Sequence, residues 1–73
     1  MKLRPLSSNK VMKILIKLDF THVRTAGSHF VFKHPDGRVI VIPVHKGELI
    51  GRGLLRKIIR DTKLSKEDFM KYT

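Results

Sequence analysis

The side chains best suited to chemistry in this sequence are its four histidines, at positions 22, 29, 34 and 45. An imidazole has an ordinary pKa of about 6.5, so it can accept or donate a proton near neutral pH. Surrounding positive charge disfavours the imidazolium and leaves a neutral ring that can accept a proton. RNA carries its own nucleophile, the 2′-hydroxyl. A histidine that moves protons beside groups that stabilise phosphate charge would therefore be enough to cleave RNA.

His29 is the best placed of the four. It follows Gly27 and Ser28 at the start of a predicted strand, where a glycine lets a phosphate approach the backbone closely. Because strand side chains alternate, His29 should point away from the face that carries Phe30 and Phe32. Ser28 would orient the substrate or the imidazole. The alternative interpretation is that His29 is simply a polar residue at a strand end.

His45 is the second candidate, because it follows Pro43 in a loop with several glycines and would face the same end of the sheet. It would be a second proton carrier or an RNA contact, and a solvated loop histidine is the competing interpretation. His22, in a weak strand, and His34, beside a hairpin turn, are expected to be solvent-exposed or structural.

No pattern for a metal or a cofactor is visible. The histidines lack zinc spacing, the six carboxylates are scattered, and the absence of Cys removes thiolate ligands and disulfides. Gly47, Gly51 and Gly53 lack the lysine and serine of a phosphate-binding loop. We therefore expect no metal site and no cofactor, and nothing specifically indicates a Ser-His-Asp triad.

The charge of the chain favours a polyanion as partner. Sixteen Lys and Arg against six Asp and Glu give a net charge of +10 in 73 residues, more than solubility requires. The basic residues predicted to contact RNA phosphates are Lys33, Lys46, Arg52, Arg56 and Lys57. For any of them, and above all for Lys10, Lys13 and Lys17, the alternative is the solvated side of an amphipathic element.

Two helices and three strands are expected to position these residues. Apolar residues at helical spacing predict a helix over 8–18, capped by Ser7 or Ser8, and a second one around 54–63. Strands are predicted over 20–24, 28–34 and 39–42, with turns at 25–27 and 35–37 and a loop over 44–52. Ser65 and Asp68 resemble a capping box that begins a C-terminal helical tail, whose Phe69 should fold back onto the core.

This order predicts an α+β fold, with two helices on one face of a three-stranded antiparallel sheet, as in a double-stranded-RNA-binding domain. We expect residues 1–73 to form one such domain. If the hairpin places His34 opposite Val39, three apolar side chains lie on the open face beside His29. That apolar surface would meet a partner through Val31, Ile40 and Ile42.

Several short segments together resemble the HicA toxin family. They are Gly27-Ser28-His29, His34-Pro35-Asp36-Gly37-Arg38, Pro43-Val44-His45 and Gly53-Leu54-Leu55-Arg56-Lys57-Ile58-Ile59. The likeness extends from the first helix to Phe69. Two positions depart from the family pattern: Asp19 stands where the family usually has glycine, and Leu54 where many members have threonine.

The resemblance implies a double-stranded-RNA-binding-like fold used as an mRNA interferase, with the catalytic histidine at His29. It also implies a toxin of a toxin–antitoxin pair, neutralised by a HicB-type antitoxin that covers the active surface. We expect mRNA and that antitoxin as partners, a homodimer of the free toxin, and a metal-independent reaction. Two other classes stay open from the residues alone: a non-catalytic RNA-binding module, and a protein-interaction domain whose charge only solvates it.

Neither a membrane span nor a signal peptide is expected. The longest N-terminal apolar stretch, over residues 11–18, contains Lys13 and Lys17 and is far shorter than the ~20 residues needed to span a bilayer. The cytoplasm is therefore the expected compartment.

Overall fold

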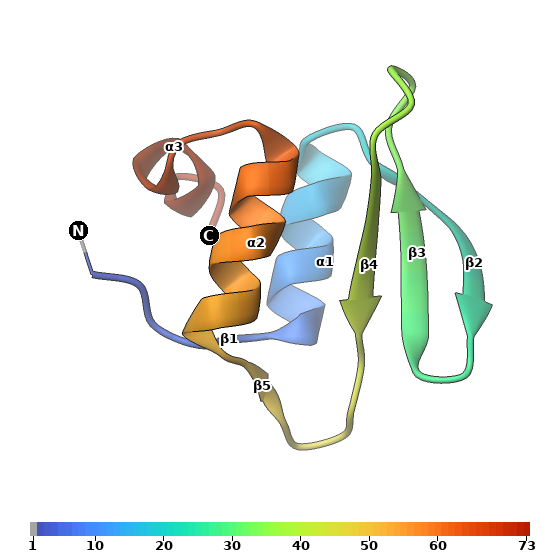
Figure 1. Cartoon of the computed structure of the whole chain (residues 1–73), viewed down its shortest axis with the longest axis horizontal. Coiled ribbons are helices and arrows are strands. Elements are labelled where there is room, and N and C mark those ends of the chain that lie inside the picture. The colour runs from blue at the N-terminus through green and yellow to red at the C-terminus, as the bar shows by residue number, and fades with distance from the viewer. Residues whose placement is uncertain (1) are drawn as a thin grey trace.

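A computed structural model describes residues 2–73 of the chain. Its elements, in chain order, are β1 (Leu6–Ser7), α1 (Ser8–Lys17), β2 (Thr21–Ala26), β3 (His29–Lys33), β4 (Val39–Pro43), β5 (Leu49–Ile50), α2 (Arg52–Thr62) and α3 (Lys66–Met70). Strands β2, β3 and β4 form an antiparallel sheet in that order, and β1 pairs with β5 in a second, two-stranded sheet. Figure 1 shows α1 and α2 side by side next to the three-stranded sheet. The predicted α+β class and its double-stranded-RNA-binding-like layout are confirmed.

Helix α1 forms where the apolar spacing predicted it. Val11, Ile14 and Leu15 are buried because they lie on one face of the helix. The Ser7 hydroxyl accepts a hydrogen bond from the Lys10 backbone N–H at 3.1 Å, so Ser7 is the N-cap. Asp19 follows the helix in left-handed backbone, with φ 72°. Aspartate tolerates that conformation better than most residues, so it can occupy a position that would otherwise favour glycine.

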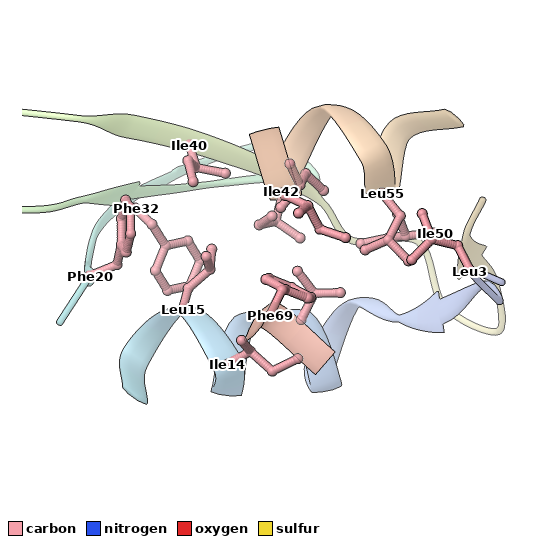
Figure 2. Packing of buried hydrophobic residues seen from close by; sticks show 13 residues of the cluster. Leu3, Ile14, Leu15, Phe20, Phe32, Ile40, Ile42, Ile50, Leu55 and Phe69 are labelled. Atoms are coloured by element: carbon pink, nitrogen blue, oxygen red, sulfur yellow. The ribbon is translucent and has the colours of Figure 1, made fainter. Parts of the chain in front are cut away.

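The C-terminal part also folds as predicted. Leu55, Ile58 and Ile59 are the buried apolar face of α2. The Ser65 hydroxyl accepts from the Asp68 backbone N–H at 3.1 Å and begins α3. Phe69 of that short helix is fully buried. Figure 2 shows the ring within the hydrophobic cluster, near Ile14 and Ile42.

The register of the β3–β4 hairpin differs from the prediction by one residue. The His34 N–H donates to the Arg38 carbonyl at 2.9 Å, and Phe32 lies opposite Ile40. Gly37 takes a left-handed φ of 98°, which lets three residues close the turn where four were expected.

This register overturns the predicted open face. Ile40 and Ile42 point toward the helices and are only 3% and 0% exposed, so the prediction that they bind a partner is wrong. Val39 and Val41 take the open positions, and a one-residue slip is enough to exchange the two sets. Val31 stays on the open face, where its neighbours leave it 7% exposed.

Two smaller differences concern the strands around the hairpin. Thr25 and Ala26 were predicted to turn, whereas both belong to β2, and Ala26 pairs with His29 across a turn at Gly27 and Ser28. Strand β2 carries an irregularity between His22 and Arg24. Its residues are all exposed, which is why it carries so weak an apolar pattern.

The predicted loop over 44–52 also contains a short strand. Leu6 pairs with Ile50 and Ser7 with Leu49, so β5 is anchored to the segment that precedes α1. Ile50 and Leu3 are buried at the far end of the core from Phe20 and Phe32 (Figure 2). A pair of two-residue strands has no period that a sequence pattern can reveal.

Arg38 connects the hairpin turn to the helices. Its Nε donates to both carboxylate oxygens of Asp36, at 3.0 and 2.8 Å, and its Nη1 donates to the Thr62 carbonyl at the end of α2, at 2.6 Å. The guanidinium also lies 5.2 Å from the centre of the Phe20 ring. The His34 ring packs edge-on against Phe20 at 5.1 Å. The segment from His34 to Arg38 is therefore structural, as expected for His34.

Asp36 should make stability depend on pH in the acid range. The hydrogen bonds from Arg38 lower the pKa of the Asp36 carboxyl from 3.8 to about 2. A carboxyl whose pKa is depressed by folding stabilises the fold above its unfolded pKa, and that stabilisation is lost as the pH falls toward the folded value. We expect the melting temperature of Asp36→Asn to lie below that of the wild type at pH 6. The two should converge between pH 4 and pH 2 in calorimetry. An equal difference in melting temperature at every pH would contradict this role of the Asp36 carboxylate.

The hairpin register predicts unequal costs for neighbouring substitutions on β4. Ile42→Val removes a methylene from the core and should cost about 0.5–1.5 kcal/mol of unfolding free energy. Val41→Ala, on the open face, should cost about 0.5 kcal/mol or less, as expected for a surface position. Urea denaturation of the two variants measures both values. If Val41→Ala lowered the free energy of unfolding more than Ile42→Val, the result would favour the register predicted from the sequence.

Candidate active site on the open sheet face

The face of the sheet turned away from the helices carries His29. His29 lies opposite Ala26 on β2 and Pro43 on β4, and Phe30 beside it points to the helix side. The imidazole is exposed. Among residues 2–73 it has no hydrogen-bond or ion-pair partner. Both ring nitrogens are therefore available to a molecule that docks on this face.

Two cations share the face with His29. Lys33 lies four residues further along β3, on the same side of the strand. Arg24 of β2 lies opposite Val31, between the rows of His29 and Lys33. Neither has an ion-pair partner in the described part of the chain. The sequence reasoning missed Arg24, which is found by counting back from the two-residue turn at Gly27 and Ser28.

The loop after β4 adjoins the same end of the sheet. The Val44 N–H donates to the Ser28 carbonyl at 2.7 Å, which ties this loop to the residue before His29. Ser28 is half-buried, and His45 and Lys46 are exposed in the loop. A pocket of about 200 Å³ lies here, with Pro43 and His45 among its walls. The expected proximity of Ser28, His45 and His29 to one end of the sheet is thus found.

The basic residues of α2 lie elsewhere. Arg52 and Arg56, one helical turn apart, line a second hollow of about 380 Å³ together with Lys2, Leu3 and Lys66. Leu54 lies on the opposite flank of α2, where it lines the pocket beside Pro43. Figure 1 shows the N-terminal segment and α3 on the side of α2 away from β2 and β3. The structure therefore does not bring Arg52 and Arg56 to His29.

Lys57 differs from both arginines. Its Nζ lies 3.1 Å from Asp61 Oδ2, an exposed ion pair one turn along the helix. Such pairs are of small energetic value, so Lys57 is partly neutralised where it was predicted to contact phosphate.

His22 is structural, as expected. Its ring stacks on Phe30, with ring centres 5.0 Å apart, and lies 5.3 Å from Phe32. Its Nε2 shares a 2.8 Å hydrogen bond with the Thr25 hydroxyl. His22 therefore lies on the helix side of the sheet, opposite to His29.

With this geometry the chain can be compared with known proteins. Residues 8–64 match a family model described as the HicA toxin of bacterial toxin–antitoxin systems. The chain belongs to the HicA toxin family. A search of curated proteins finds no match. As a HicA toxin, the protein is one half of a pair whose other half is an antitoxin.

The structure separates the roles of the HicA motif residues. In this HicA chain the segment from His34 to Arg38 shapes the hairpin, whereas Gly27, Ser28 and His29 present an exposed imidazole. Leu54, in place of the family's threonine, adds an apolar wall to the pocket near Pro43.

Two further observations concern the described residues 2–73. Nowhere among them do three or more His, Cys, Asp or Glu side chains gather in a way that would hold a metal ion. None of their helices is long and apolar enough to cross a membrane.

Proposed function

We propose that this HicA toxin is an endoribonuclease that cleaves mRNA through His29 without a metal. The observation that carries the proposal is an exposed imidazole, without a partner among the residues that the structure describes, flanked on one sheet face by Arg24 and Lys33. The remaining cations and the net charge of +10 supply the attraction for RNA. We further propose that residues 1–73 act as one domain, in the cytoplasm.

The proposed reaction uses the nucleophile of the substrate. Neutral His29 accepts the proton of a 2′-hydroxyl, whose oxygen then forms a bond to the adjacent phosphorus. The bond from phosphorus to the 5′-oxygen breaks, and that oxygen takes a proton from an acid, for which His45 is the candidate. The products are a 2′,3′-cyclic phosphate and a 5′-hydroxyl. Arg24 and Lys33 stabilise the charge that builds on the phosphate oxygens, and Ser28 orients the substrate or the imidazole.

The other predicted RNA contacts belong to a separate surface. Arg52 and Arg56 would hold backbone phosphates on the far flank of α2, with weaker help from Lys57 because of its pair with Asp61. Lys46, in the loop after β4, is closer to the His29 end of the sheet. These contacts raise affinity but take no part in proton transfer.

The same open face is the proposed docking surface for a HicB-type antitoxin. Val39 and Val41 are 51% and 43% exposed and, with Val31, form an apolar strip beside His29. A partner that covers this strip would also cover the imidazole and block RNA. When the antitoxin is absent, two copies of the toxin would pair through this strip.

The proposal predicts the outcome of a cleavage assay in EDTA. His29→Ala should lower the rate of RNA cleavage by at least 100-fold, because general acid–base catalysis contributes about 10²–10⁴-fold. RNA affinity should change little, and calorimetry should show a folded variant. His22→Gln, which alters a histidine on the opposite side of the sheet, is the matched control and should retain activity. Equal cleavage by wild type and His29→Ala would sink the assignment of His29. Salt-sensitive binding without cleavage by either would favour the non-catalytic RNA-binding module.

A second experiment separates the two cationic surfaces. Arg24→Gln with Lys33→Gln should slow cleavage at saturating RNA, because these side chains face the reacting phosphate. Arg52→Gln with Arg56→Gln should leave the saturated rate unchanged and weaken binding. The slope of log affinity against log salt should become shallower by about 1.4, since each single-strand phosphate contact contributes about 0.7.

Lys10→Gln with Lys13→Gln on α1 removes the same charge and serves as the control for net charge alone. An equal loss of slope in this control would contradict a specific site on α2. No salt dependence in the wild type would favour the protein-interaction domain.

A further inference from the structure

The pocket beside Pro43 has a composition suited to one small, flat, partly polar group. Its volume of about 200 Å³ is below the range of about 300–1,000 Å³ typical of sites for drug-sized ligands. The walls are mainly apolar, and two polar side chains stand among them. The lining residues are Pro43, His45, Glu48, Leu49, Ile50, Gly51 and Leu54.

The loop after β4 leaves the side chains of His45, Glu48 and Leu49 exposed to solvent. Gly47 adopts φ 78°, and the Glu48 N–H donates to the His45 carbonyl at 3.0 Å, so one tight turn presents both residues. Leu49 is 63% exposed and Leu54 37% exposed. Exposed large apolar side chains that adjoin a pocket are typical of a binding surface.

Glu48 is an acidic residue in a part of the sequence that is otherwise basic. It is the only acidic residue between Asp36 and Asp61. Among residues 2–73 its carboxylate has no hydrogen-bond or ion-pair partner. A carboxylate repels phosphate and accepts hydrogen bonds without donating them. Glu48 is therefore suited to donors on a nucleobase and unsuited to the RNA backbone.

Pro43 joins this pocket to the proposed catalytic centre. It is the cross-strand partner of His29 and lies on the same face of the sheet, where paired residues are about 4.5–5.5 Å apart at Cα. The pocket wall thus begins next to the imidazole. A strand whose phosphate lies at His29 places a neighbouring base at the pocket mouth.

We propose that this pocket binds the base next to the cleaved bond and selects bases with an amino group at purine C6 or pyrimidine C4, namely adenine and cytosine. The inference rests on the proposed nuclease function. The amino group donates to the Glu48 carboxylate, while the base plane packs on the apolar walls and on the His45 ring. Uracil and guanine present a carbonyl oxygen at that position, and two acceptors repel each other.

A partner protein is the less favoured occupant. An apolar side chain in the pocket would leave the Glu48 carboxylate buried and unpaired, which costs more than the contact returns. A partner that complements a +10 chain carries acidic side chains, and Glu48 repels these as well.

Cleavage of four RNAs that differ only in the base next to the cleaved bond tests the proposal. The wild type should cleave the uracil and guanine substrates about tenfold or more slowly than the adenine and cytosine substrates, in line with the loss of a hydrogen bond to a charged group. Glu48→Gln should erase most of that difference, because an amide can also donate to the carbonyl of uracil or guanine. Glu67→Gln, on α3, makes the same charge change away from the pocket and should keep the preference. Equal rates on all four RNAs, or an unchanged preference in Glu48→Gln, would overturn the proposal.

Binding of free nucleotides separates this inference from the nuclease proposal. In His29→Ala, the amide signals of Gly51 and Leu54 should shift in NMR spectra on addition of AMP or CMP, and much less with UMP or GMP. Selective shifts would support the pocket even if the wild type cleaves no RNA, which would remove only the nuclease. Absent or unselective shifts beside active cleavage would overturn the pocket and leave the nuclease. Shifts caused only by the antitoxin would likewise overturn it and assign the pocket to the protein interface.

Discussion

The turn between β3 and β4 determines which side chains are core and which are surface. Strand side chains alternate, so a slip of one residue exchanges the two faces of the hairpin. Gly37 closes the turn, and Arg38 holds it against Asp36 and the end of α2. With this register Phe32 and its neighbours fill the core under the helices. His29 and Lys33 of β3 face away from the helices, and the register places Val39 and Val41, instead of Ile40 and Ile42, on that same face.

The sequence predicted best what is local in the chain. Helix α1 and the Ser65 cap depend on residues within a turn or two of one another, and both were predicted. The hairpin register was not, because residues 39–42 are β-branched without a break and alternation cannot choose between them. Strands β1 and β5 were missed because pairing between distant two-residue segments has no sequence signal.

In the candidate site, too, the sequence predicted local features better than features that depend on long-range pairing. The position of His29 follows from a glycine, a serine and a strand, all adjacent in sequence. Which cations accompany it depends on long-range pairing, which brings Arg24 to the face of His29. Arg52 and Arg56 were predicted to contact phosphate from their charge density after a glycine-containing loop, although charge density gives no direction. The rotation of α2 turns them to the other flank.

The pairing of Leu6 with Ile50 also bears on the order of folding. Among residues 2–73 it closes the longest loop between two paired strands. The chain loses conformational entropy when that loop closes, before the contact contributes favourable energy. We therefore expect the β2–β3–β4 sheet, whose strands pair across short turns, to form first. The segment that forms the pocket near Pro43 would then become ordered last. In a newly made chain the proposed catalytic face would exist before its neighbouring pocket, so that substrate discrimination would mature after the capacity for proton transfer.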